Sequence, residues 1–358
     1  MKPITFGIAG NGWRADFYLR IAQHCPKRFK VAALTSRSAE TRTRLEQTWG
    51  VKTFESVQQM VKHTELDFVV TSVPWETNPG IVTYLAENQI PCLSETPPAP
   101  DIEGLIKLNQ IARQHHAKIQ IAEQFHLQPA HAARIAAVES GVLGNISQIQ
   151  LSVAHGYHAI SLIRKILGVG YETADISGVT FESELINGPG RYGPPAKEEI
   201  ITSEQHIFRI QFGGKLAIVD FSTDQYFSPI RNARVLIRGH RGEIMNNEVS
   251  YLKDYLTPVR LEFIRHSAGG DGDLRGLYLE GIQLGDEWLY TNPFIPARLT
   301  DEELAIASCL EKMADYVETG RDFYSLAQGS QDQYLSLMMD QALHEQKTLR
   351  TELMEWSA

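Results

Sequence analysis

Gly10, Gly12 and Ala15 lie where an apolar run typical of a strand gives way to a helical pattern. Gly10 permits a tight turn, and Gly12, which lacks a Cβ, lets backbone N–H groups approach an anion at the positive end of the helix. Ala15 lets that helix pack closely on the strand. The spacing predicts a turn that binds the diphosphate of a dinucleotide, the alternative being a generic strand-to-helix turn. Asn11 and Trp13 belong to the same turn, and Trp13 either covers the cofactor or packs on the neighbouring loop.

The end of the second expected strand bears on which dinucleotide is bound. In NAD-binding proteins an acidic residue there accepts hydrogen bonds from both ribose hydroxyls. The sequence here is Ser36-Arg37, with no acidic residue before Glu40. Because Ser36 can donate to a 2′-phosphate and Arg37 can pair with it, the charge balance favours NADP over NAD. The alternative is that both residues form an exposed loop.

The elements that would position this turn follow from the apolar pattern up to about residue 122. Short apolar runs alternate with amphipathic ones, which predicts right-handed βαβ units and a parallel sheet buried on both faces. The expected strands are Ile4–Ala9, Phe29–Thr35, Phe68–Val73, Pro91–Ser94 and Lys118–Ala122. The expected helices lie around Arg14–Ala22, Ala39–Trp49, Ser56–Lys62, Pro79–Glu87 and Asp101–His115.

The pattern changes after Pro129, where a helix over His131–Glu139 is followed by segments that alternate apolar and polar residues. Alternation predicts an antiparallel sheet with one face on helices and one face open to solvent or a partner. The alternating segments are Ile146–Ala154, Gly178–Glu184, His206–Phe212, Leu216–Thr223, Ala233–Arg238, Val249–Leu252 and Arg260–Arg265. Two Gly/Pro-rich loops interrupt them, and helical patterns begin after Thr300, an expected N-cap, and at Gln328.

Composition excludes several classes of protein. The 358 residues exceed what one hydrophobic core usually fills, so we expect two domains. With 43% apolar and 22% charged residues, a net charge of −9 and no Lys/Arg block, the chain reads as globular and not as a nucleic-acid-binding protein. No apolar window is long enough for a membrane span, and no secretion signal is apparent. Three widely spaced cysteines, Cys25, Cys92 and Cys309, suit a reduced cytoplasm rather than a disulfide framework.

Five sequence motifs follow one another along the chain in a fixed order. They are Gly10–Ala15 with Ser36-Arg37, Asp67–Pro74, Cys92–Pro97, Glu123–Pro129 and Gly156–Gly168. In this order they resemble the glucose–fructose oxidoreductase, inositol dehydrogenase and rhizopine-catabolism (Gfo/Idh/MocA) family, of which the chain looks like a divergent member. The third segment stands at the place of the family's Glu-Lys-Pro, and the fifth is similar to its Gly-x-His-x-x-Asp helix. The resemblance covers nearly the whole chain.

The resemblance implies an α/β protein with two domains. Residues 1–124 would form a Rossmann domain with a doubly wound parallel sheet. Residues 125–358 would form a substrate and oligomerisation domain with a large, open, mainly antiparallel sheet, and its C-terminal helix is a candidate to pack back on the Rossmann domain. Typical members are homo-oligomers and transfer hydride between NAD(P) and a hydroxyl of a sugar, polyol or related compound. Besides the turn and Ser36-Arg37, the implied cofactor contacts are Ser72, Pro74, Glu95 and Gln124.

The chain departs from the family at three polar positions. Thr96 replaces the lysine of Glu-Lys-Pro, which contacts cofactor and substrate and assists proton transfer. Threonine supplies neither a positive charge nor a proton that is exchanged near neutral pH. Ala154 and Ser161 replace acidic residues that flank the family's catalytic histidine. Thr96 stays in the candidate catalytic set, but the departures weaken a standard dehydrogenase mechanism.

His158 is the first candidate acid or base, because it matches the family's histidine and its type titrates near neutral pH. Oxidation of an alcohol needs a base close to the hydroxyl oxygen, and reduction needs an acid. His158 begins the helix expected over Ala159–Leu167, whose positive end favours the neutral ring. Ser161 and Lys165 share its helix face. Lys165 either replaces the lost lysine or is a solvated surface cation.

Other side chains are weaker candidates. His126, at the domain crossing, either takes part in catalysis or is structural. Tyr157 and Arg164 are candidate substrate contacts, as are Arg191 and Tyr192 in the first Gly/Pro-rich loop, which is either a lid or a plain connection. No set of His, Cys and acidic residues has a metal-ligand spacing, so no metal site is expected.

Three functions remain open. The leading interpretation is an NAD(P)-dependent oxidoreductase, with NADP favoured, acting on a small polyhydroxylated substrate in the cytoplasm, without nucleic-acid or membrane partners. The second is a catalytically lapsed NAD(P)-binding sensor or regulator, which Thr96 and Ala154 favour and His158 disfavours. The third is an enzyme that uses bound NAD as a recycled prosthetic group, which needs a second base from His126 or Tyr157.

Overall fold

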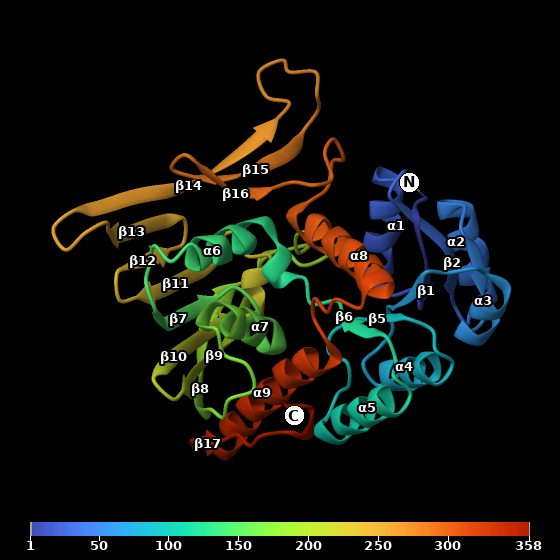
Figure 1. Cartoon of the computed structure of the whole chain (residues 1–358), viewed down its shortest axis with the longest axis horizontal. Coiled ribbons are helices and arrows are strands. Elements are labelled where there is room, and N and C mark those ends of the chain that lie inside the picture. Colours follow the sequence, from blue (N-terminus) through green and yellow to red (C-terminus); the bar gives the residue numbers. More distant parts are fainter. Residues whose placement is uncertain (1, 358) are drawn as a thin grey trace. The chain divides into compact units, whose positions relative to one another are not determined.

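Figure 1 shows the computed structural model, which describes residues 2–357. The chain divides into two units, each made of several segments. Unit 1 comprises Met1–Pro129, His266–Gly281 and Thr291–Gln333, and unit 2 comprises Ala130–Arg265, Ile282–Tyr290 and Tyr334–Ala358. The first segment of unit 1 ends close to the boundary expected after residue 124. The two later segments of unit 1 fall inside the range expected for the second domain. The chain therefore comes back to unit 1 twice after entering unit 2, which local sequence patterns cannot predict.

The sheet of unit 1 is parallel and has the strand order β3-β2-β1-β4-β5-β6. Its strands are β1 (Ile4–Ala9), β2 (Phe29–Thr35), β3 (Lys52–Phe54), β4 (Phe68–Thr71), β5 (Cys92–Ser94) and β6 (Ile119–Ile121). Five of the six were expected, and the sixth, β3, has three residues and no buried side chain, too short a pattern to detect. The order reverses between β1 and β4, so the carboxyl ends of these two strands form the place where open α/β sheets bind ligands.

Five helices connect these strands. They are α1 (Trp13–His24), α2 (Ala39–Trp49), α3 (Val57–His63), α4 (Asn78–Glu87) and α5 (Ile102–Gln114). Ser38, Ser56 and Asp101 cap α2, α3 and α5 by accepting a hydrogen bond from a backbone N–H three residues later. Helix α1 instead begins after Gly12, which has no side chain to cap it. Its first N–H groups therefore suit an anionic ligand.

Helix α8 (Asp301–Thr319) belongs to unit 1 although it lies late in the sequence. Its N-cap is Thr300, as predicted: Thr300 Oγ1 accepts from the backbone N–H of Glu303, and the Glu303 carboxylate accepts from the backbone N–H of Thr300. The helix packs against α1 and against the short 3₁₀ helix η1 (Phe125–Leu127). These contacts place residues of the late segment beside the first turn of α1.

The second sheet has eleven strands in the order β16-β15-β14-β13-β12-β11-β7-β10-β9-β8-β17. Its strands are β7 (Ile146–Ser152), β8 (Asp175–Ile186), β9 (Ile200–Phe212), β10 (Lys215–Ser222), β11 (Arg234–Gly239), β12 (Gly242–Met245), β13 (Glu248–Leu252), β14 (Pro258–Ala268), β15 (Tyr278–Leu284), β16 (Glu287–Thr291) and β17 (Leu349–Arg350). From β17 to β14 the pairs are antiparallel, apart from the parallel pair β7–β10. The expectation of a mainly antiparallel sheet is confirmed, and the alternating segments all fall on strands.

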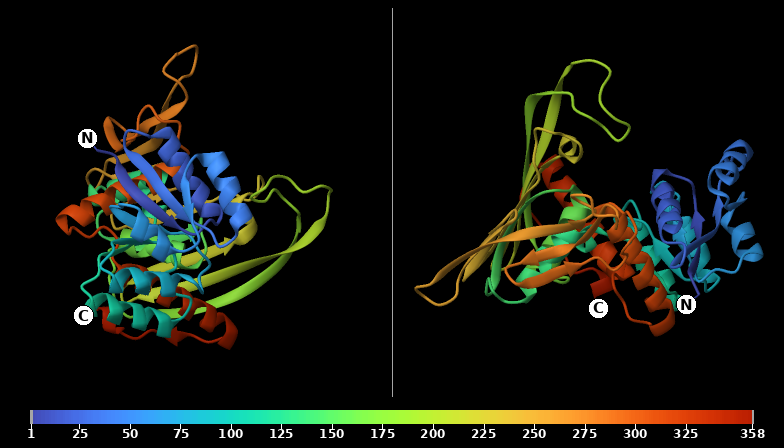
Figure 2. Two further views of the ribbon diagram at one scale, coloured as in Figure 1. Left: turned by 90° about the vertical axis from the view of Figure 1, so that its right-hand side faces the viewer. Right: turned by 90° about the horizontal axis from the view of Figure 1, so that it is seen from above.

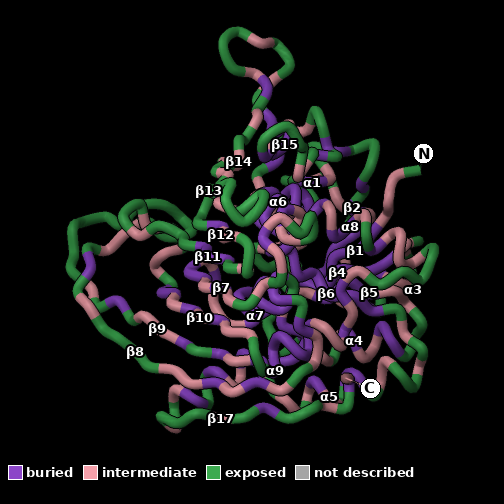
Figure 3. Tube along the Cα trace, turned by 60° about the vertical axis from the view of Figure 1, so that its left-hand side comes forward, coloured by how far each residue is buried: buried purple, intermediate pink, exposed green. Residues whose placement is uncertain are grey.

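Strands β8 and β9 form a long curved pair that continues into the loop over residues 187–199 (Figure 2). Much of this pair is exposed or half-buried, in contrast to the buried strands of unit 1 (Figure 3). Val179, Phe181, Ile186 and Ile200 are exposed apolar side chains on it. Val179 and Phe181 lie on one face of the pair, and Ile186 and Ile200 lie on the other. Exposed apolar side chains on a long strand pair are typical of a surface that binds another protein.

The remaining helices are α6 (Pro129–Glu139), α7 (Gly156–Leu167), α9 (Leu326–Glu345) and the 3₁₀ helices η2 (Thr223–Tyr226) and η3 (Glu355–Ser357). Helix α7 packs on β7 and β10 and ends at Gly168, whose left-handed conformation stops it. Within residues 2–357, every helix is too short or too polar to serve as a membrane span.

Candidate functional sites

The glycine turn follows β1 at the point where the strand order reverses. Gly10 has a φ of +109°, and a Cβ there would lie 2.1 Å from the carbonyl oxygen of Ser72. The backbone N–H of Gly10 donates to Thr35 Oγ1 at 2.9 Å, and that of Ser72 donates to the carbonyl of Ala9 at 2.7 Å. The turn therefore packs directly on the strand end that carries Ser72. Both its conformation and its packing require glycine at position 10.

Neither backbone conformation nor packing requires glycine at position 12, in contrast to position 10. Its φ of −65° and ψ of 172° are open to any residue, and a Cβ there would meet Ser72 only at an ordinary contact distance of 3.5 Å. The fold itself thus tolerates a side chain at position 12. The lack of one leaves room in front of the first N–H groups of α1, which is the arrangement that a dinucleotide diphosphate needs.

Trp13 is the first residue of α1. Its ring contacts Phe17 edge-on, with centroids 5.6 Å apart, and the Arg14 guanidinium lies 4.6 Å from its centroid. The indole is partly exposed. These contacts orient the indole and leave it accessible, so its predicted role over the cofactor remains a prediction.

The end of β2 carries positive charge. Ser36 is buried and Arg37 is exposed. Arg42, on α2, donates from Nη1 to the carbonyls of Ser36 and Arg37, at 2.8 and 3.0 Å. Two guanidinium groups thus lie at this strand end, and Glu40 on the first turn of α2 is the nearest carboxylate in sequence.

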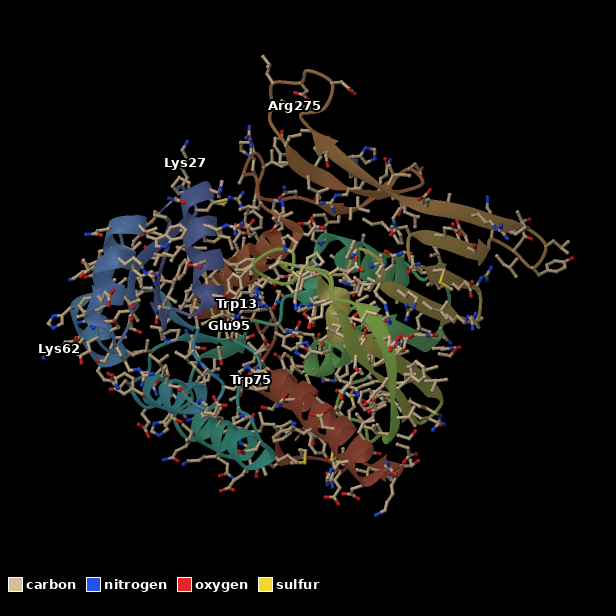
Figure 4. The ribbon with its side chains drawn as sticks, turned by 180° about the vertical axis from the view of Figure 1, so that it is seen from behind. Trp13, Lys27, Lys62, Trp75, Glu95 and Arg275 are labelled. Atoms are coloured by element: carbon tan, nitrogen blue, oxygen red, sulfur yellow. The ribbon has the colours of Figure 1, made fainter. Side chains whose placement is uncertain are left out.

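Glu95, at the end of β5, accepts a hydrogen bond from the Tyr18 hydroxyl at 2.5 Å, and Arg14 Nε lies 3.7 Å from its other oxygen. Burial raises the pKa of the Glu95 carboxyl, an effect that Arg14 opposes, and burial likewise raises the pKa of Tyr18. Arg14 also pairs with Glu302 of α8 at 2.7 Å. Figure 4 labels Glu95 near Trp13 at this side of unit 1. The Glu95 carboxylate is thus engaged by α1, and Thr96, which follows it, is half-buried.

Gln124 and His126 lie at the start of the crossing segment, with defined neighbours in unit 1. The Gln124 amide donates to Glu302 at 2.9 Å, and Gln128 donates to the other oxygen of Glu302 at 2.6 Å. The buried His126 ring stacks on Tyr324, with centroids 5.1 Å apart. These contacts support structural roles for both side chains, and their predicted roles in binding and catalysis stay predictions.

His158 lies in the first turn of α7 within a group of aromatic rings in unit 2. Its buried ring is 4.4 Å from that of Tyr157 and 5.4 Å from that of His155, measured between centroids. His155 is the N-cap residue of α7, and its Nδ1 lies 2.6 Å from the Tyr226 hydroxyl. Burial lowers the pKa of His155 to about 4, with a contribution from His158. His155 is therefore neutral at pH 7.

Sequence reasoning missed Tyr226 and gave His155 no role. The His-Gly-Tyr-His run at the start of the expected helix was the available signal for His155. Tyr226 is 71 residues away on η2, and only the pairing of β7 with β10 brings η2 to this helix end.

The other predicted residues of α7 are less favourably placed for chemistry. Ser161 donates to the carbonyl of His158 at 2.9 Å, so its hydroxyl bonds the helix backbone. Arg164 donates to the carbonyl of Gly170 at 3.0 Å and lies over the Tyr171 ring, and Lys165 is exposed. Ala154 is fully buried. The face of α7 that carries His158 thus offers one side chain suited to proton transfer.

The Gly/Pro-rich loop after β8 is exposed over most of its length. The Arg191 guanidinium lies 5.9 Å from the ring centroid of Phe227, the residue that follows η2, whereas Tyr192 is almost fully exposed. The contact of Arg191 ties this loop to the segment that carries Tyr226.

Cysteine and metal chemistry receive no support among residues 2–357. All three cysteines are free and buried, and burial raises the pKa of each thiol. The described part of the chain contains no cluster of three His, Cys, Asp or Glu side chains suited to a metal ion.

Two sequence comparisons gave matches to parts of the chain. Residues 4–123 match the GFO_IDH_MocA model, described as an oxidoreductase family with an NAD-binding Rossmann fold. The rhizopine catabolism protein MocA of Rhizobium meliloti is 25% identical over 146 residues. That match spans 41% of this chain and 45% of the relative, less than half the length of either.

Solved structures are similar over nearly the whole chain. An oxidoreductase from Agrobacterium radiobacter, in complex with NAD⁺, L-tartaric acid and magnesium, has a TM-score of 0.69 at 16% identity and covers 97% of this chain and 98% of its own. Apo scyllo-inositol dehydrogenase from Lactobacillus casei has a TM-score of 0.67 at 18% identity and covers 98% of both chains. The WlbA dehydrogenase from Bordetella pertussis, in complex with NADH and UDP-GlcNAcA, has a TM-score of 0.64 at 13% identity and covers 98% of this chain and 100% of its own. These likenesses show the fold, and the predicted fold class is confirmed.

Proposed function

We propose that the chain is an NAD(P)-dependent dehydrogenase or reductase of the Gfo/Idh/MocA oxidoreductase family, whose NAD-binding Rossmann model matches residues 4–123. Its substrate would be a sugar, a polyol or a derivative of one. Two structural neighbours support this substrate class: a scyllo-inositol dehydrogenase, and a dehydrogenase in complex with UDP-GlcNAcA. The compartment would be the cytoplasm, which three free cysteines suit.

The observation that carries the proposal is the contrast between Gly10 and Gly12. Of these two glycines the fold requires only Gly10, because a Cβ at position 12 meets nothing closer than 3.5 Å. Gly12 is therefore explained by a ligand that approaches the N-terminus of α1. Bound NAD(P) supplies or accepts the hydride. The chain's part is to hold the diphosphate at this turn and to manage the proton on the substrate oxygen.

His158 is the proposed acid or base for that proton. Its buried ring lies in the first turn of α7, next to the rings of Tyr157 and His155. A neutral ring can accept the hydroxyl proton as the alcohol is oxidised, and in the reverse direction its protonated form returns it.

NADP is the proposed cofactor in preference to NAD. Arg37 and Arg42 at the end of β2 attract a 2′-phosphate, and the acidic residue that would bind the ribose hydroxyls of NAD is missing there. The structurally similar oxidoreductase from Agrobacterium radiobacter was solved with NAD⁺, so the preference for NADP needs a direct test.

Arg37→Glu should weaken NADP⁺ binding at least about tenfold relative to NAD⁺, whereas Arg44→Glu on the exposed side of α2 should not. Tighter binding of NAD⁺ than of NADP⁺ by the wild type would contradict the preference.

Two measurements test the activity. Thermal unfolding should show stabilisation by one cofactor pair, about 2.7 kcal/mol at one hundred times its Kd. The absorbance of the reduced nicotinamide is then followed with myo-inositol, scyllo-inositol, D-glucose and their oxidised forms.

His158→Gln should lower kcat roughly 100- to 10,000-fold without altering cofactor binding, whereas His24→Gln, on the exposed face of α1, should have no effect. Full activity of His158→Gln would exclude His158 as the acid or base.

A second candidate function is a cofactor-binding sensor or regulator. It is favoured by Thr96 in the place of the family lysine and by Ser161 in the place of an acidic residue, since the Ser161 hydroxyl donates to the carbonyl of His158. Cofactor binding without turnover of any substrate in the panel would support it. Formation of product without net change in the cofactor would instead support the third candidate, a recycled prosthetic group.

A further inference from the structure

We propose that Tyr226 is a second substrate-binding group, one that contacts a hydroxyl of a neutral polyol, and that His155 is the positioning residue that holds it. The inference rests on the proposed function, since it extends the substrate-binding side of unit 2 beyond His158. It assigns a role to two side chains that the dehydrogenase mechanism does not itself require.

Two hydrogen bonds hold the Tyr226 hydroxyl. The backbone N–H of His155 donates to the phenol oxygen at 3.2 Å, and His155 Nδ1 lies 2.6 Å from the same oxygen. Because His155 is neutral at pH 7, its Nδ1 can accept the phenol proton. The hydroxyl of this partly exposed tyrosine is thus held by two contacts from one residue.

The segment that carries Tyr226 is itself fixed. A capping box between Ser222 and Gln225 begins η2, and the Ser152 hydroxyl at the end of β7 donates to the same Gln225 side chain at 3.1 Å. The Tyr226 ring also packs edge-on against Phe221, with centroids 4.8 Å apart. These contacts make η2 a rigid platform and not a mobile loop.

The pair lies next to the proposed acid or base. The His155 ring is 5.4 Å from the His158 ring and 5.8 Å from the Tyr226 ring, so it stands between them. A substrate whose hydroxyl reaches His158 would therefore have neighbouring hydroxyls within range of Tyr226. This spacing fits a molecule with several hydroxyls and not a simple alcohol.

The two groups of the pair are themselves suited to a neutral substrate. Arg234, on the neighbouring strand β11, pairs with Asp220 at 2.7 Å, and Asp224 of η2 accepts from Ser203 at 2.5 Å. His155 is uncharged at pH 7, and its ring contacts the Tyr226 hydroxyl. A phenol and a neutral imidazole recognise hydroxyl groups well and carboxylates poorly, because neither supplies a positive charge.

The test measures binding of myo-inositol, scyllo-inositol and D-glucose to the cofactor-loaded protein by calorimetry, with the wild type and four variants. Tyr226→Phe keeps the ring against Phe221 and removes the hydroxyl. His155→Asn keeps an acceptor near the Nδ1 position, and His155→Leu removes it. Tyr255→Phe, on the exposed hairpin between β13 and β14, is the matched control for loss of a phenol.

Tyr226→Phe and His155→Leu should each weaken binding of the best ligand about tenfold, the effect expected for one lost hydrogen bond. His155→Asn should retain most of the affinity and Tyr255→Phe all of it. NAD(P) affinity should be unchanged in every variant. A deoxy analogue that lacks the contacted hydroxyl should bind wild type and Tyr226→Phe equally, which a merely structural role would not produce.

The inference is overturned if the wild type binds none of the three polyols, if Tyr226→Phe binds them within twofold of the wild type, or if His155→Asn and His155→Leu lose affinity equally. Binding that depends on Tyr226, but without hydride transfer, would support the inference and count against the proposed enzymatic function alone. The two failures are thereby distinguishable.

Discussion

At the scale of single residues, the glycine turn shows how one motif combines two physical demands. Gly10 is required by its positive φ and by the carbonyl of Ser72 against it. Gly12 has neither constraint. A sequence pattern treats the two glycines alike, whereas the structure separates the one that the fold needs from the one that a ligand needs.

This separation makes a prediction for two substitutions. Gly12→Ala should fold with a Tm near that of the wild type and lose most of its affinity for NAD(P), because a methyl group enters the path of the diphosphate. Gly10→Ala should be strongly destabilised, by roughly 1–3 kcal/mol or more, because it combines backbone strain with a clash. Chemical denaturation and cofactor titration measure both effects. Normal cofactor binding by Gly12→Ala would contradict the assignment of the turn.

At the scale of elements, the N-terminus of α7 is built around a neutral histidine. His155 occupies the N-cap position without a capping hydrogen bond from its side chain, and its ring lies beside His158, Tyr157 and Tyr226. Burial lowers its pKa to about 4. Its ordinary pKa is about 6.5, so the unfolded chain binds this proton at a higher pH than the folded chain does. The stabilising contribution of the neutral ring is thus complete above pH 6.5 and is lost as the pH falls towards 4.

We therefore expect the free energy of unfolding to fall between pH 6.5 and pH 4, with His155 contributing at most about 3 kcal/mol of the change. His155→Asn cannot be protonated in this range and should flatten the dependence. Urea denaturation at several pH values measures it, with His24→Asn, on exposed α1 surface, as the control. An equally steep dependence in His155→Asn would show that His155 does not titrate as described.

At the scale of the whole molecule, the strand pair β8–β9 has exposed apolar side chains on the face that carries Val179 and Phe181. These two residues are two positions apart on β8, so they share a face, and both are more than half exposed. Members of the family that the chain resembles usually form homo-oligomers, and the alternating pattern of these strands predicts an open face. A homo-oligomer formed through this face is the corresponding expectation.

Light scattering coupled to size-exclusion chromatography tests that expectation. The wild type should have at least twice the mass of one 40.2 kDa chain, and Phe181→Glu should shift it towards the single chain by placing a charge in the interface. Leu256→Glu, at the exposed tip of the β13–β14 hairpin, is the matched control and should keep the wild-type mass. A monomeric wild type would contradict the expectation.

Sequence alone determined the elements whose signals are local. Most strands of unit 1 were predicted because parallel strands buried on both faces are continuous apolar runs. The glycine turn was predicted because the spacing of Gly10, Gly12 and Ala15 is set by contacts within a single turn. The Thr300 cap was predicted for the same reason, since a capping box lies within four residues. Strand β3 was not predicted, because its three residues lie at the edge of the sheet and are too few to show an apolar pattern.

Only the tertiary structure decided which distant residues meet. It placed α8 against α1, and thereby Glu302 beside Arg14 and Gln124, and it brought Tyr226 to the N-cap of α7. It also showed that Glu95 bonds to Tyr18 and that Ser161 bonds to its own helix. Periodicity and spacing report how a segment buries its own side chains. The partner of a polar group is set by strand order and by chain segments that return from far along the sequence, and neither leaves a local pattern.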